Sequence, residues 1–120
     1  MVEIESARQP EPLHVSSTAT DGVTVVRVVG EIDHASAGPL IETLDLDALS
    51  NQPRLVIDMR GVSFMDSSGI NVLLAAHHDL APAGWLRLAG VRDSVLRTLK
   101  IVGVDTVIPC HPNLKEALTG

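Results

Sequence analysis

Short apolar runs along the chain predict strands. VTVVRVVG at residues 23–30 and LVIDM at residues 55–59 are almost wholly apolar, which is typical of strands that are buried on both faces. WLRLAG at residues 85–90 alternates between apolar and polar positions, which favours a strand with one buried face. TVIP at residues 106–109 predicts a short last strand.

Two polar segments predict turns. LHVSSTA at residues 13–19 alternates as a strand does, and Thr20-Asp21-Gly22 connects it to the next apolar run. Asp and Gly both tolerate positive φ, so this connection predicts a hairpin between the first two strands. Arg60-Gly61 follows the LVIDM run and is expected to turn the chain.

Three further segments show the spacing of helices with one apolar face. The first begins near Ser36, with Pro39 tolerable only within its first turn. The other two are VRDSVLRTLKIVG, which Gly103 ends, and the short terminal NLKEAL. The expected core positions are Leu40, Ile41, Leu44 and Ala48 in the first of these helices, and Val95, Leu96, Leu99 and Val102 in the second.

Another helix is predicted to begin at Ser67 and to end before Pro82 and Gly84. At about 100° per residue its positions divide into two sides. The buried side is expected to hold Ile70, Leu73, Leu74 and His77, and the exposed side Ser67, Ser68, Asn71, Ala75, His78 and Asp79.

The predicted order is strand, strand, helix, strand, helix, strand, helix, strand, helix. Alternation of this kind predicts an α/β fold with a mixed, mainly parallel sheet of about four to five strands and about four helices packed on it. With 120 residues the chain fits one domain. We expect residues 1–12 to form a flexible arm and residues 13–120 to form the domain.

Charge and composition exclude several classes of partner. The chain carries 15 acidic against 9 basic residues, a net charge of −6. The basic residues form no run, so neither a nucleic acid nor a membrane surface is an expected partner. No stretch reaches the roughly 18–20 apolar residues that a membrane helix needs. The acidic start is unlike a secretory signal, and Cys110 has no partner for a disulfide, so a cytoplasmic location is expected.

Known catalytic and metal motifs are missing from the sequence. It contains no GxxxxGK[ST], GxGxxG, HExxH or GxSxG. No histidine is spaced to act as a base for Ser67, so we expect no hydrolase activity. His77 and His78 are adjacent on a helix, so their side chains diverge by about 100° and cannot share one ion. We therefore expect no enzyme activity, no metal and no cofactor.

The stretch FMDSSG, residues 64–69, allows two interpretations. Asp and Ser are common where helices begin, so Asp66, Ser67 and Ser68 could simply cap the following helix. Alternatively, one hydroxyl is a switch. A helix N-terminus tolerates a phosphate, because it offers free N–H groups and a partial positive charge.

Three segments resemble one family. LVIDMRGVSFMDSSGINVLLAAH, GEIDHAS at residues 30–36 and VRDSVLRTLKIVGVDTVI resemble the STAS domain of bacterial anti-sigma factor antagonists. The resemblance covers roughly residues 13–119. It implies a binding protein whose unphosphorylated form binds an anti-sigma factor that is also a serine kinase, and so releases a sigma factor. It also implies that a serine phosphatase restores this form.

Carried onto this chain, the resemblance implies that Ser67 accepts the phosphate. It implies that Asp33 lies close to the phosphorylation site and that Gly69 lets the partner's backbone approach. The partner surface is then expected to comprise Asp33, Asp66, Ser67, Ser68, Gly69, Asn71 and Ala75. An open alternative is a STAS module that serves as a constitutive adaptor of a transporter or of a stress-signalling complex.

Overall fold

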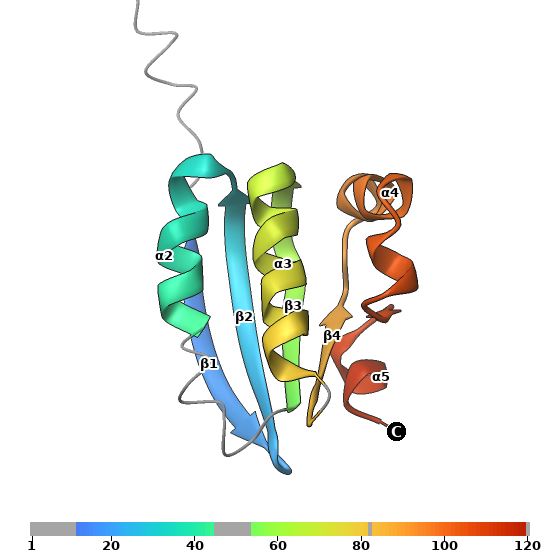
Figure 1. The fold of residues 1–120 in the computed structure, drawn as a ribbon. Helices are drawn as coiled ribbons and strands as arrows, with labels where there is room; N and C mark the ends of the chain where they lie inside the picture. Colours follow the sequence, from blue (N-terminus) through green and yellow to red (C-terminus); the bar gives the residue numbers. More distant parts are fainter. Residues whose placement is uncertain (1–11, 45–53, 82, 120) are drawn as a thin grey trace, which may run out of the picture.

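The computed structural model describes residues 12–44, 54–81 and 83–119. It holds one five-stranded sheet in the order β1-β2-β3-β4-β5 (Figure 1). Only the β1–β2 pair is antiparallel, so the predicted mixed, mainly parallel sheet is confirmed. The strands are β1 (His14–Thr20), β2 (Val23–Ile32), β3 (Arg54–Met65), β4 (Trp85–Ala89) and β5 (Cys110–His111).

The described helices confirm the predicted element order. They are α2 (His34–Leu44), α3 (Ser67–Leu80), α4 (Asp93–Ile101), the 3₁₀ turn η2 (Val104–Thr106) and α5 (Leu114–Leu118). None of them is long and apolar enough to cross a membrane. The predicted arm falls outside the described residues except for Pro12, and so does Ala48; both expectations stay predictions.

The hairpin forms where the sequence predicts it. Thr20 pairs with Val23, and between them Asp21 and Gly22 have φ values of 52° and 80°. Positive φ at both turn residues matches the right-handed twist of the two strands.

The prediction that Arg60-Gly61 turns the chain is wrong, because β3 continues to Met65. β4 pairs with β3 only as far as Asp58, whereas β2 stays paired to the end, with Met65 opposite Ile32. A Cβ at Gly61 would lie 2.8 Å from the Val29 side chain. The glycine therefore permits close packing between strands and does not mark a turn.

The last strand lies later than predicted. Thr106 ends η2, and the strand is Cys110–His111. The amides of Val107 and Ile108 both donate to the Val104 carbonyl, at 2.9 and 2.8 Å, and so hold this segment in a tight turn. The predicted TVIP strand is therefore wrong, because local hydrogen bonds prevail over its β-branched composition.

Three predicted core residues are largely exposed, namely Ile41 at 52%, Leu74 at 37% and Val102 at 56%. The first two lie at the margin of an apolar stripe whose centre is buried, and Val102 follows the last residue of α4. Pro39 is the sixth residue of α2, so it lies beyond the first turn. The helix begins earlier than predicted, at His34. Pro39 has no N–H to bond the carbonyl of Ala35, but Ala35 is exposed, so water can bond this carbonyl.

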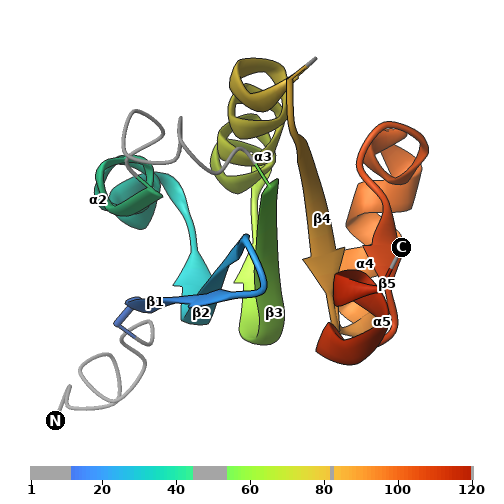
Figure 2. The ribbon, with the colours of Figure 1, turned by 90° about the horizontal axis from the view of Figure 1, so that it is seen from below.

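Two apolar clusters lie on opposite faces of the sheet. Side chains from α2, α3 and α4 form the larger cluster with residues such as Val28, Ile57 and Met59. Figure 2 shows α2 and α3 on one side of the sheet. The smaller cluster joins α5 to Val25 and Val56, the alternate positions of the same strands. The first face is thus covered by three helices and the second by one short helix.

Candidate functional site

The loop between β3 and α3 is built around Asp66. Its backbone is extended, and its Oδ1 accepts hydrogen bonds from the amides of Ser68 at 2.8 Å and Gly69 at 3.4 Å. Its own amide donates to the Ile32 carbonyl at 3.1 Å, which fixes the loop against the end of β2. Asp66 is therefore the N-cap of α3.

Because Asp66 caps the helix, neither serine has that task. Ser67 is the first residue of α3 and is exposed, as predicted, whereas Ser68, which was also expected on the exposed side, is half-buried. Among the hydrogen bonds of the described residues, none involves the Ser67 hydroxyl. The cap interpretation is therefore confirmed for Asp66 and wrong for the two serines.

Gly69 serves the packing of α3 onto the sheet. It is buried, and a Cβ there would lie 2.7 Å from Met65 Cγ and 2.8 Å from Ile32 Cγ2. The glycine thus lets α3 approach the ends of β2 and β3 and so sets the position of Ser67. Its requirement is internal to the fold, and its expected contact with a partner stays a prediction.

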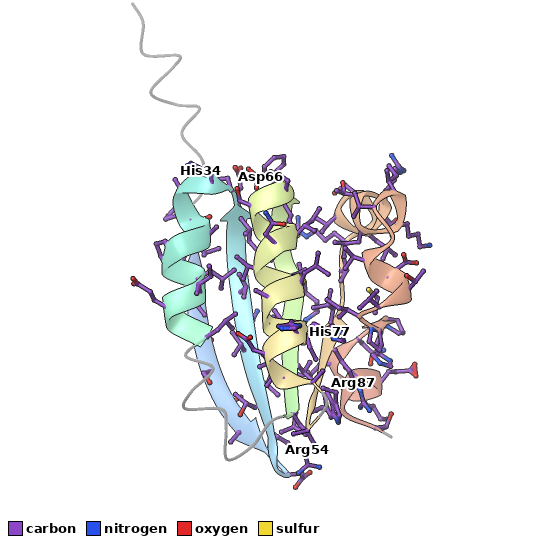
Figure 3. The ribbon with its side chains drawn as sticks, in the orientation of Figure 1. His34, Arg54, Asp66, His77 and Arg87 are labelled. Atoms are coloured by element: carbon purple, nitrogen blue, oxygen red, sulfur yellow. The ribbon has the colours of Figure 1, made fainter. Side chains whose placement is uncertain are left out.

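Asp33 repeats the arrangement of Asp66 on the neighbouring strand. Its Oδ1 accepts from the amides of Ala35 and Ser36, both at 3.0 Å, and its own amide donates to the Ser36 hydroxyl at 2.9 Å. Asp33 directly follows Ile32, whose carbonyl binds the Asp66 amide. The starts of α2 and α3 therefore lie side by side at the carboxyl ends of β2 and β3, where His34 and Asp66 are seen at the same end of the molecule (Figure 3).

The exposed side of α3 continues downward from Ser67. Asn71 and Ala75 are exposed, as predicted, and so are His78 and Asp79. Leu74, which was expected in the core, adds an apolar side chain at the margin of this surface. The structure thus brings together Ser67, Asn71 and Ala75 on one helix, with Asp66 beside them and Asp33 on the adjacent helix start.

Sequence reasoning missed two exposed residues at this end. His34 is exposed as the first residue of α2, and Phe64, near the end of β3, is 47% exposed. The signal for His34 was Asp33 followed three residues later by Ser36, a pairing typical of a helix start. It places the first helical residue at His34, two residues before Ser36. Phe64 had no signal, because its exposure depends on β4 ending at Ala89 while β3 continues.

The other candidate ligands form no site within the described residues. There, no group of three or more His, Cys, Asp or Glu side chains could hold a metal ion. His77 is half-buried and His78 is exposed, as expected, with His77 Nδ1 buried and unpaired. Burial raises the pKa of the half-buried Cys110 thiol, and the negative charge of Asp105 raises it further. A thiol in that state is a weak nucleophile.

Comparison with known proteins places the chain in a family. The model of the STAS domain matches residues 14–117, so the chain belongs to the STAS domain family. It is 28% identical to the anti-sigma-F factor antagonist RsfB of Mycobacterium tuberculosis, over 92% of this chain and 91% of the relative. It is 30% identical to an anti-sigma F factor antagonist of Paenibacillus polymyxa, over 82% and 86%. The crystal structure of an anti-sigma factor antagonist from Mycobacterium paratuberculosis superposes with a TM-score of 0.84 at 30% identity, over 92% of this chain and 94% of that one.

Proposed function

We propose that this protein is an anti-sigma factor antagonist that is switched by phosphorylation of Ser67. In its unphosphorylated form it binds an anti-sigma factor with serine kinase activity and so frees a sigma factor in the cytoplasm. Phosphorylation by that kinase ends the interaction, and a serine phosphatase restores it. The observation that carries this proposal is the exposed, unpaired Ser67 hydroxyl beside a helix cap that Asp66 supplies alone.

The position of Ser67 suits a phosphate. Phosphorylation adds a charge of about −1.5 to −2 and three acceptor oxygens. At the first residue of α3 this charge meets the partial positive charge of the helix N-terminus, so the fold tolerates it. The same charge would enter a partner interface formed with Asn71, Ala75, Ser68 and the two capping aspartates, Asp33 and Asp66. Burying this charge in an interface without a matching cation is costly, so binding changes although the fold does not.

The proposal assigns the chemistry to the partners. The kinase supplies the nucleotide and the catalytic base, and this chain supplies the hydroxyl that is phosphorylated. Its 28% and 30% identical relatives are named as antagonists, which supports a role in protein binding over a catalytic role. The proposed role involves no cofactor, nucleic acid or membrane.

The experiment that tests this function is site mapping by mass spectrometry of the protein recovered from its own cells. We expect one phosphate on Ser67, absent in Ser67→Ala and retained in the matched control Ser68→Ala. Calorimetry with the purified kinase partner should then show binding weakened about 5- to 150-fold by Ser67→Asp, the usual range of binding switches. A stoichiometric complex that is insensitive to Ser67→Asp would instead favour the constitutive adaptor.

A further inference from the structure

The second face of the sheet carries arginines where α5 no longer covers it. Arg27 on β2 and Arg60 on β3 continue the alternate positions that begin with Val25 and Val56. Arg27 is opposite Asp58 in the β2–β3 register and is exposed. Arg92, just before α4, donates from Nε to the Arg60 carbonyl at 2.9 Å. Arg27, Arg60 and Arg92 are called the arginine cluster below.

A buried carboxylate holds this cluster in place. Asp58 is the one polar or charged residue among the described positions that is buried, at 2% exposure. Its oxygens accept from Arg60 Nε at 3.1 Å and Nη2 at 2.9 Å, and Oδ1 also accepts the Arg60 amide at 3.2 Å. The Arg60 side chain nevertheless stays 56% exposed. A paired contact of this kind orients the guanidinium and leaves its remaining N–H groups directed outward.

The backbone around Arg60 also fits its side chain. Gly90 has a φ of 67°, and a Cβ there would lie 2.3 Å from Arg60 Cγ. The stem of Arg60 therefore occupies space that only a glycine leaves open. Arg60 is thus held by three hydrogen bonds to Asp58 and by close packing, although its charged group faces solvent.

The charge of the arginine cluster is opposite to that of the whole protein. Three of the nine basic residues lie together here, whereas the chain carries a net charge of −6. Asp58 neutralises one of the three arginines, and the Arg27 side chain has no ion pair or hydrogen bond within the described part of the chain. Arg60 and Arg92 are held in place by their hydrogen bonds, which reduces the entropy that binding an acidic group costs, whereas the Arg27 side chain must still be ordered on binding.

An acidic segment is attached to the chain close to this face. Residues 1–11 contain Glu3, Glu5 and Glu11 against one basic residue, Arg8. They join the fold at Pro12, whose carbonyl oxygen lies 2.6 Å from the Cβ position of Gly30 on β2. Arg27 lies three residues along β2 from Gly30, about 10 Å at 3.3 Å per residue. Eleven extended residues span up to about 36 Å, so the glutamates can reach the cluster.

We propose that the arginine cluster on the uncovered face of the sheet binds the acidic N-terminal segment, residues 1–11, of the same chain. Covalent attachment gives this segment an effective concentration in the millimolar range, so it occupies the cluster ahead of free acidic peptides. The cluster lies on the face of the sheet opposite to α3. This placement is independent of the role proposed for Ser67.

The test uses the full chain with Ile4→Cys carrying a nitroxide spin label and Cys110→Ser in the background. We expect paramagnetic broadening of the Ser16, Arg27 and Arg60 amides. Replacing all three glutamates by Gln should reduce this broadening at least several-fold, and so should the double variant Arg27→Gln/Arg92→Gln. Raising the salt to about 1 M should do the same, because it screens these charges.

The matched control is Arg97→Gln/Lys100→Gln on α4, which removes the same charge from another part of the molecule. It should leave the broadening unchanged. Equal loss in this control would overturn the proposal, since net charge alone would then govern the contact. Absence of broadening in the parent chain would also overturn it.

Discussion

Two aspartates on or directly after β3 use their carboxylates in different ways. Asp58 is buried and its hydrogen bonds fix an arginine side chain, whereas Asp66 is half-buried and its hydrogen bonds cap the backbone of α3. The first presents an oriented cation, and the second leaves the neighbouring Ser67 hydroxyl unpaired. One type of residue thus fixes an arginine side chain in one place and a helix start in another, and the environment of the carboxylate decides which one.

The largest effect is expected from Arg60→Ala, which leaves Asp58 without its counter-ion. We expect the free energy of unfolding to fall more than in the other variants below, because Asp58 stays buried and loses its counter-ion. Urea denaturation would measure this change. Arg27→Ala, on the same face but without a recorded partner, should change stability by less than about 0.5 kcal/mol. Similar losses in both variants would contradict the special role of the Asp58 pair.

A smaller loss is expected from Gly69→Ala, which adds a methyl group between α3 and the sheet. Its Cβ would lie 2.7 Å from Met65 Cγ. Overpacking of this kind costs about 1–3 kcal/mol, and the better helix propensity of alanine offsets about 1 kcal/mol of it. Gly38→Ala in α2 is the control, because nothing lies within 4 Å of its Cβ position. Denaturation curves should show a loss for Gly69→Ala and none for Gly38→Ala.

Asp66→Ala should cost about 1 kcal/mol through loss of the cap of α3. The amides of Ser68 and Gly69 lose their acceptor in this variant. Hydrogen exchange should therefore accelerate in the first turn of α3 while the centre of the sheet stays protected. Unchanged exchange at these two amides would show that another group, such as a serine hydroxyl, caps the helix.

The smallest effect on stability is expected from Ser67→Ala, at less than about 0.5 kcal/mol, because the hydroxyl is exposed and has no recorded partner. Thermal unfolding of this variant and of Asp66→Ala under the same conditions compares the two neighbours directly. A loss as large as that of Asp66→Ala would mean that Ser67 is part of the cap, and the free hydroxyl would lose its support.

Local pattern alone predicted much of the fold and of the site. The apolar runs predicted β2 and β4, and the Asp21-Gly22 pair predicted the hairpin. The helical period of about 100° per residue predicted that Ser67, Asn71 and Ala75 lie on the exposed side of α3. These features depend on contacts between residues close in sequence and on the period of the helix or strand. The STAS resemblance, which the family match confirms, rests on the same segments.

Tertiary structure decided the features that depend on distant neighbours. The sequence at Arg60-Gly61 predicts a turn, but pairing with β2 continues the strand through it. Ile41 is predicted in the core, but the sheet buries only the centre of the apolar stripe on α2. The cap of α3 uses local hydrogen bonds of Asp66, but the place of this loop against β2 depends on the Ile32 carbonyl, more than thirty residues away. The sequence by itself thus determined the elements and their exposed sides, because these follow local periodicity. Only the packed structure decided which polar groups are satisfied and which stay free, because hydrogen-bond partners come from any part of the chain.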